Sequence, residues 1–114
     1  MTYRVILLAE AKRAIERNAS WWAEHHSAEQ AARWMDAVHD QLHSLEEFPE
    51  SHSLSPENDD FDFEIRDKLV GLGSRKRYRA VFTIQDNEVF VLALRAAEQG
   101  PLVAGELDFE LDSD

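Results

Sequence analysis

The chain has no cysteine among its 114 residues, so it forms no disulfide and offers no thiolate to a metal. It has no apolar run long enough to cross a membrane, and its first residues, MTYRVILLAEAKR, lack the layout of a signal peptide. No internal repeat or low-complexity tract is visible. These absences predict one cytoplasmic domain, large enough to bury a core without cross-links, that works away from membranes.

Positive charge is scarce in this sequence. The chain has 12 Lys and Arg against 23 Asp and Glu, and its net charge of −11 disfavours non-specific binding to nucleic acid. Seven of the cations lie between residues 66 and 95, where they give a local charge of +4 and leave −15 for the remainder. They are Arg66, Lys68, Arg75, Lys76, Arg77, Arg79 and Arg95. A basic segment in an acidic protein marks a candidate surface for an anion or a partner.

The basic segment coincides with a predicted β-hairpin at residues 75–95, RKRYRAVFTIQDNEVFVLALR. Apolar β-formers flank the turn formers at 86–88, and side chains alternate between the two faces of each strand. A three-residue loop collects the large apolar groups on one face. The predicted pairs are Ile84–Phe90, Phe82–Leu92 and Ala80–Leu94. The opposite face would then be cationic, with Arg77, Arg79 and Arg95.

The segments before the hairpin predict a strand, two helices and another strand. Residues 2–8 are β-branched and apolar, and helix-forming sequence runs from Ala9 to about residue 26. Ser27 and Gln30 form a capping box for a second helix, which Phe48-Pro49 ends. A surface loop is predicted at 50–60, and alternating apolar residues at 61–65 predict a strand that extends toward residue 70.

The predicted fold class is therefore α+β, an antiparallel sheet packed on a helical hairpin in the order β-α-α-β-β-β, over residues 1–97. Residues 98–114 form an acidic tail with six acids and no base. In this tail Leu107, Phe109 and Leu111 alternate with acids. The tail is either a disordered end, or a segment that folds over the cationic face or adds an edge strand to a neighbour. The sequence leaves open whether two copies of the chain form a homodimer.

The order of these segments resembles the RelE/ParE toxins of bacterial type II toxin–antitoxin systems. The resemblance rests on YRVILLAEAKRAI, LHSLEEFPE, FEIRDKLVG and YRAVFTIQDNEVFVLAL, and covers the chain to about residue 97. It implies a toxin without a cofactor that a cognate antitoxin neutralises. RelE-like members cut mRNA on the ribosome, whereas ParE-like members poison DNA gyrase.

The RelE-type site uses lysines before the central hairpin, an arginine after its first tyrosine, and a later arginine and tyrosine. An ungapped alignment retains Arg79 but places Val70 and Leu72 at the lysines and Gln99 at the later arginine, and no tyrosine follows Tyr78. Arg79 can stabilise developing charge but is a poor proton shuttle. The resemblance thus favours a ParE-like gyrase inhibitor that is not an enzyme. The alternatives are a RelE-like mRNA endonuclease with Arg79 as its catalytic residue, and a solitary non-toxic member.

Several residues have two interpretations. Arg79 and Arg95 either form an anion or partner site or are neutralised by acidic neighbours such as Glu64 or the tail. Arg66 either joins the cationic face or forms an ion pair within the molecule. Arg79→Ala is expected to abolish toxicity without unfolding. The residues expected to bind an anion or a partner are Arg66, Arg75, Lys76, Arg77, Arg79 and Arg95. The candidates for an antitoxin interface are Trp21, which lies off the buried helical stripe, and Trp34, which flanks it.

His39 and His43 lie one helical turn apart, with Asp36 and Asp40 nearby, a spacing that can hold a metal. A second ligand pair of the kind found in zinc helices is missing. We therefore expect a solvated helix face there and no metal site.

Overall fold

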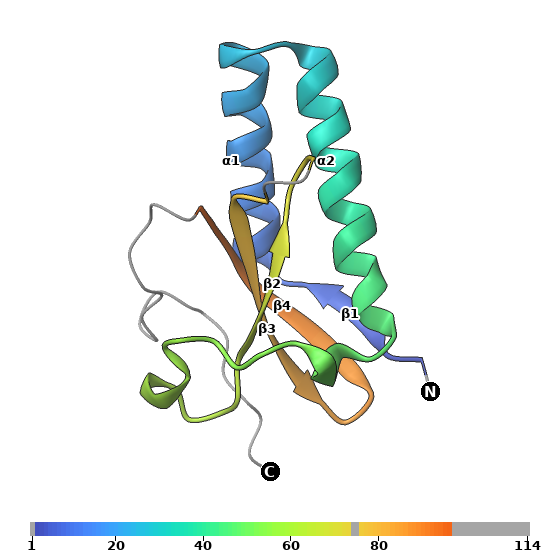
Figure 1. Cartoon of the computed structure of the whole chain (residues 1–114), viewed down its shortest axis with the longest axis vertical. Helices are drawn as coiled ribbons and strands as arrows, with labels where there is room; N and C mark the ends of the chain where they lie inside the picture. Colours follow the sequence, from blue (N-terminus) through green and yellow to red (C-terminus); the bar gives the residue numbers. More distant parts are fainter. Residues whose placement is uncertain (1, 74–75, 97–114) are drawn as a thin grey trace.

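The computed structural model describes residues 2–73 and 76–96, in which a four-stranded sheet is covered on one face by two α-helices (Figure 1). The predicted class and the order β-α-α-β-β-β are confirmed. The elements are β1 (Arg4–Leu7), α1 (Ala9–His25), α2 (Ala28–His43), β2 (Arg66–Val70), β3 (Tyr78–Gln85) and β4 (Glu88–Ala96). Within these residues, no helix is long and apolar enough to span a bilayer.

The strand order in the sheet is β1-β4-β3-β2, which makes β1 and β2 the two edges. Strands β2, β3 and β4 are antiparallel neighbours, but β1 runs parallel to β4, from the pair Arg4–Glu88 to the pair Leu7–Val91. The prediction of a wholly antiparallel sheet is therefore wrong for this pair. Both helices lie between β1 and the other strands in the chain, and a long connection of this kind lets β1 run parallel to its neighbour β4.

The two helices form the predicted antiparallel hairpin and stand side by side over the sheet (Figure 1). The Oγ of Ser27 accepts a hydrogen bond from the backbone N–H of Gln30 at 3.0 Å, so the predicted cap starts α2. At the other end α2 stops at His43 and a 3-10 turn follows at Ser44–Glu46. Phe48 then adopts a left-handed φ of 52° before Pro49 begins a second 3-10 turn, so the α-helix ends earlier than predicted. Most of the inward side chains of α1 are small, and those of α2 are large: Ala11, Ala14, Ile15 and Ala19, and then Ala31, Trp34, Val38 and Leu42.

Trp34 lies at the centre of the core between the helices and the sheet. It is 0% exposed, and its ring packs edge-on against Tyr78 with 5.1 Å between the ring centroids. The prediction that Trp34 forms part of an antitoxin interface is therefore wrong, because no partner can reach a fully buried ring. Trp21 is 46% exposed and stays available as an interface residue.

The register of the hairpin differs from the prediction. Gln85 pairs with Glu88, so the turn has two central residues, and Asp86 adopts the positive φ of 56° that tight hairpin turns require. Ala80 pairs with Leu94 as predicted. Between this pair and the turn, the register shifts at Val81–Phe82, where a β-bulge in β4 leaves Leu92 as the extra residue. The predicted pairs Ile84–Phe90 and Phe82–Leu92 are therefore wrong; the observed pairs are Ile84–Val89 and Phe82–Val91.

The bulge places Leu92 in a second, smaller core on the outer face of the sheet, away from the helices. This core consists of Ile65, Val81, Leu92 and Ala93, with Leu8, Phe61, Phe63 and Phe90 packed against it. Residues 61–65 thus form no strand; they cover the sheet, and the strand begins at Arg66. Residues 50–60 are only partly a surface loop, since Ser55 and Glu57 are buried. The predicted cationic face is consequently covered at its centre by apolar side chains.

We expect Trp34→Ala to destabilise the protein by ~3–5 kcal/mol, because it opens a cavity in the main core. The matched variant Trp21→Ala, at the exposed tip of the helical hairpin, should change stability by no more than about 0.5 kcal/mol. Chemical denaturation followed by far-UV circular dichroism measures both. Equal losses would show that Trp34 is not the central packing residue.

Candidate functional site

Arg79 lies in an ion cluster on the outer face of the sheet. Both terminal nitrogens of its guanidinium donate to the carboxylate of Glu57, one of them at 2.8 Å, and Nη1 donates to Asp67 Oδ2 at 2.9 Å. The hydroxyl of Ser55 donates to the same Asp67 carboxylate. The side chain of Glu57 is 4% exposed, and those of Asp67 and Arg79 are each 18% exposed. Charge-assisted hydrogen bonds of this kind are among the stronger ones in proteins.

The cluster neutralises Arg79 within the molecule. Hydrogen bonding to Glu57 raises the pKa of the guanidinium, burial opposes that shift, and Asp67 raises the pKa further. Sequence reasoning allowed for such neutralisation but named Glu64 or the acidic tail as its source. The buried acid is Glu57, which is 22 residues away in the chain and falls in a segment that was interpreted as a surface loop.

The positions on β2 that face Arg79 hold no lysine. Leu69 is its direct cross-strand partner, and Asp67 lies two residues earlier on the same face. Lys68 points to the other face, toward the helices, because side chains alternate along a strand. Strand β2 and the loop before it therefore place one apolar and two acidic side chains around Arg79, and its neighbour on β4 is Arg95.

The other predicted cations do not form one surface. Arg95 pairs with Arg79 across the hairpin, as predicted. Arg66 lies opposite Phe82 on the helix-facing side, 3.7 Å from a Glu64 carboxylate oxygen, and it donates to the backbone carbonyl of His52 at 2.6 Å. Lys76 and Arg77 are exposed. Arg75 lies outside the described residues.

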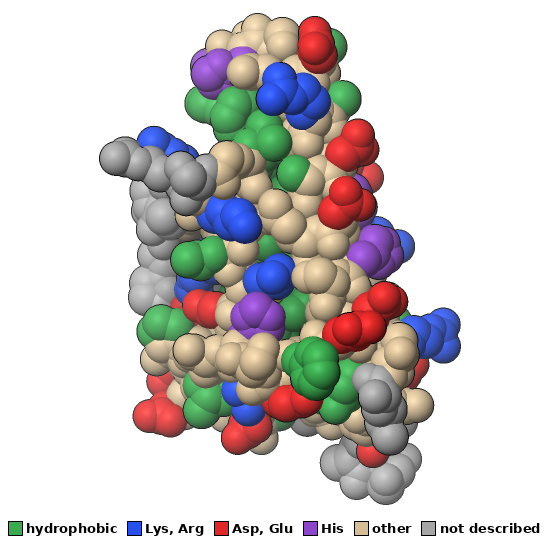
Figure 2. Space-filling model, turned by 45° about the vertical axis from the view of Figure 1, so that its right-hand side comes forward, with side chains coloured by type: hydrophobic (Ala, Val, Ile, Leu, Met, Phe, Trp, Pro, Cys, Tyr) green, Lys and Arg blue, Asp and Glu red, His purple; other side chains and the backbone are tan. Residues whose placement is uncertain are grey.

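A different basic group surrounds the helix-facing side of β2, and we call it the basic edge: Arg66 and Lys68 on β2, His52 packed on Phe82, and Lys76, whose charge acts on Lys68. Burial lowers the pKa of Lys68, and the nearby charge of Lys76 lowers it further. Burial also lowers the pKa of His52, with smaller effects from Lys68 and Arg66. Figure 2 shows Lys and Arg side chains (blue) with a His (purple) down the middle of this face, and acidic side chains (red) along its right-hand side.

Sequence reasoning missed Lys68 and His52 as members of this group. Alternation along β2 is a signal that could have placed Lys68 beside Arg66. No sequence pattern marks His52, which reaches the group because its ring packs edge-on against the buried Phe82, 5.8 Å between centroids.

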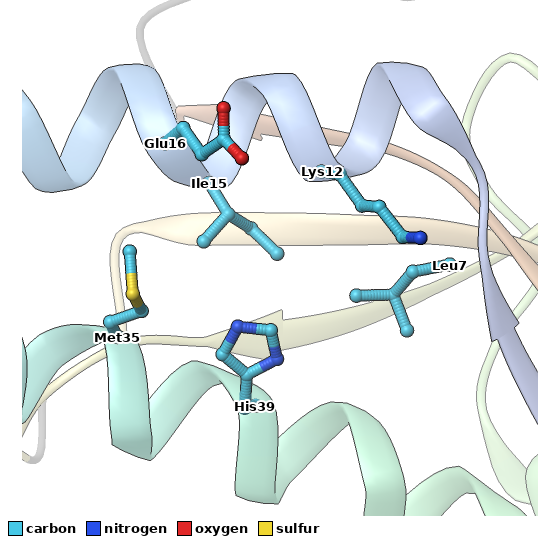
Figure 3. Close-up of a pocket in the computed structure, with 6 residues that line it drawn as sticks. All are labelled: Leu7, Lys12, Ile15, Glu16, Met35 and His39. Carbon is cyan, nitrogen blue, oxygen red and sulfur yellow. The ribbon is translucent and has the colours of Figure 1, made fainter.

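A pocket of about 220 Å³ lies between the two helices. Leu7, Ile15 and Met35 give it apolar walls, and polar groups stand around them (Figure 3). The polar groups are Lys12 and Glu16 from α1 and His39 from α2. Such a site can receive an apolar side chain of a partner while its rim makes polar contacts. Within the described residues, no three His, Cys, Asp or Glu side chains are grouped closely enough to hold a metal.

The tip of the helical hairpin carries an exposed aromatic group. Trp21 stacks on His25 with 4.4 Å between centroids, and Trp22 lies 4.6 Å from His26. Aromatic side chains that are held in place but exposed are common in protein interfaces.

We expect Arg79→Ala to destabilise the fold by ~3–5 kcal/mol, because it leaves the carboxylates of Glu57 and Asp67 without their cation. This outcome replaces the expectation of lost toxicity without unfolding. Urea denaturation measures the change, and Arg77→Ala, an exposed arginine two residues earlier, is the control. An unchanged midpoint for Arg79→Ala would show that the cluster does not stabilise the loop that supplies Glu57.

The lowered pKa of His52 predicts a pH dependence of stability. The unfolded chain, with an ordinary value near 6.5, takes up a proton more readily than the folded chain does. Stability should therefore fall as the pH drops below about 6.5 toward the folded pKa of His52, and be fully present above that window. Unfolding of wild type and His52→Gln between pH 5 and 8 measures the difference; identical slopes would contradict the assignment.

The comparisons with known proteins agree with this fold. The sequence model described as "ParE toxin of type II toxin-antitoxin system, parDE" matches residues 5–101. A structure of a chromosomal ParDE system from P. aeruginosa superposes with a TM-score of 0.70 at 13% identity, over 85% of this chain and 98% of that one. A free-state mutant of the E. coli toxin RelE gives 0.50 at 22% identity, over 86% of each chain.

At these identities the two structures support the fold alone, and no curated protein sequence matches the chain. The family match, by contrast, extends over most of the sequence, from β1 to beyond the end of β4. The chain therefore belongs to the ParE toxin family of type II toxin–antitoxin systems.

Proposed function

We propose that this toxin acts by binding DNA gyrase and is neutralised by a cognate antitoxin, rather than by cutting mRNA. The observation that carries the proposal is the occupied guanidinium of Arg79, which is hydrogen-bonded to Glu57 and Asp67. Arg79 is the one residue of the RelE-type cleavage set that the chain retains. Both of its terminal nitrogens already donate to these carboxylates, so a phosphate would have to compete with them for the guanidinium.

The chemistry of RNA cleavage supports the same conclusion. A nuclease needs cations that stabilise the developing charge on the phosphate, and a group with a suitable pKa to move a proton. On the side of β2 the chain presents Leu69 and two carboxylates to Arg79, and carboxylates repel a phosphate; the like-charged neighbour Arg95 lies on the side of β4. A phosphodiester would have to displace Glu57 from a site where it is almost fully buried.

The helical hairpin supplies surfaces that suit an antitoxin. The pocket between the helices has apolar walls and a polar rim, and the exposed Trp21 lies at the tip of the same hairpin. Interfaces of this kind combine an apolar anchor with a polar surround. A small antitoxin that binds both features would cover the helical hairpin. We place toxin, antitoxin and gyrase in the cytoplasm.

Expression of the chain in growing bacteria tests the proposal. We expect arrested growth with double-strand DNA breaks and an SOS response, intact mRNA, and loss of supercoiling by purified gyrase on addition of the protein. Arg77→Ala, which leaves the ion cluster intact, is the control for expression level.

Two results would contradict the proposal. Cleaved mRNA with undamaged DNA would identify a RelE-like endonuclease, in which case Arg79 must leave its carboxylate partners during the reaction. Normal growth at a confirmed level of folded protein would identify a non-toxic member of the family.

A further inference from the structure

Two lysines of the basic edge have no carboxylate partner within residues 2–73 and 76–96. Neither Lys68 nor Lys76 forms an ion pair there, whereas Arg79 on the outer face is paired with two acids. Burial and the charge of Lys76 both lower the pKa of Lys68, and a neighbouring carboxylate would act in the opposite direction. The described part of the fold therefore leaves positive charge at this edge without an anion.

The fold brings these lysines and His52 to one place. Lys68 lies on the helix-facing side of β2, diagonally across from Phe82 on β3, and the ring of His52 packs on Phe82. Diagonal neighbours of this kind lie about 7–8 Å apart. Lys76 returns beside the end of β2, where a Cβ added to Gly71 would lie 3.5 Å from the Cα of Lys76. Three basic side chains from separate segments thus share one surface (Figure 2).

The surroundings of these groups favour a bound anion. Lys68 and His52 are half-buried, and the pKa of His52 is lowered first by burial and then by the charges of Lys68 and Arg66. Like charges that are close together and partly shielded from water repel one another, and an anion between them offsets this repulsion. Arg66 is already in use, since it donates to the carbonyl of His52 and pairs with Glu64. The remaining donors are the two lysine ammonium groups and the imidazole.

The small number of these donors distinguishes between two kinds of anion. A nucleic acid strand carries a phosphate at every nucleotide, and its binding at physiological salt depends on many cationic contacts. Two lysines and a histidine of lowered pKa, with acidic side chains along one side of the same face, do not supply them (Figure 2). An acidic polypeptide segment can present one or two carboxylates here and place neutral residues elsewhere. Lysine and imidazole N–H groups form charge-assisted hydrogen bonds to a carboxylate.

We propose that Lys68, Lys76 and His52 form a binding site for the carboxylates of an acidic segment in a partner polypeptide. The site is a property of the basic edge alone, so it is independent of whether the toxin acts on gyrase. Half-buried charges that gain a partner across an interface contribute to specificity as well as to affinity.

Titration with a synthetic acidic peptide tests the site. Hexaglutamate added to the 15N-labelled full chain should shift the amide signals of His52, Lys68 and Lys76, and added salt should weaken its binding. Hexaglutamine, which has the same length but no charge, should leave these signals unchanged. Absence of shifts, or shifts centred elsewhere, would overturn the proposal. So would tighter binding of a single-stranded DNA of equal charge, which would identify a nucleic-acid site.

Matched removal of charge tests the assignment to Lys68. Lys68→Gln should weaken hexaglutamate binding by about fivefold, because it removes a half-buried cation from the site. Arg33→Gln removes the same charge from the exposed surface of α2 and should change the affinity by less than about twofold. Equal losses in the two variants would show that the peptide responds only to net charge, and the assigned site would be wrong.

The stability of Lys68→Met tests whether Lys68 has an anionic partner within the molecule. The lowered pKa of Lys68 means that its charge is less favourable in the folded chain than in the unfolded one, so the neutral methionine should leave the urea midpoint unchanged or raise it. A fall as large as that of Arg79→Ala would reveal an internal carboxylate partner and overturn the proposal. Because the variant is made in the full chain, the test includes the acidic tail, which lies outside the described residues.

Discussion

The hydrogen-bonded ion cluster of Arg79 with Glu57 and Asp67 is the interaction on which the outer half of the molecule depends. It joins β2, β3 and the loop before β2, which are distant in sequence. The same loop continues into residues 61–65, which cover the second core. A buried ion pair adds little net stability compared with apolar packing, but the loss of one partner is costly. The cluster therefore acts chiefly to specify where the loop lies.

The β-bulge at Leu92 gives the sheet two apolar faces. On the helix side of the bulge, Phe82 and Val91 contact the main core; on the outer side, Leu92 and Ala93 contact Ile65. An unbroken ladder would place Leu92 opposite Phe82, on the helix-facing side. Because the bulge turns Leu92 outward, a chain of this size buries both sides of its sheet with only two helices and one loop.

These two features decide which surfaces are left for function. Arg79 is used internally, so the basic edge of β2 offers a partner or an anion a positive charge that does not depend on this arginine. The helical hairpin contributes a pocket with apolar walls and the exposed Trp21. The described surface is thus suited to contacts with polypeptides, in agreement with the proposed action through protein binding.

The sequence by itself determined the two helices, the central hairpin and the order of the elements, because hydrophobic periods, turn formers and the Ser27 cap act over a few residues. It also placed Ala80, Phe82 and Ile84 on the helix-facing side, since alternation is local. Only the tertiary structure decided the bulge at Leu92, the burial of Trp34, the parallel pairing of β1, and the partners of Arg79. Each of these depends on groups brought together from distant parts of the chain. Glu57 illustrates the reason: a carboxylate in a polar segment carries no local signal that it will be buried, because the arginine that neutralises it lies 22 residues away.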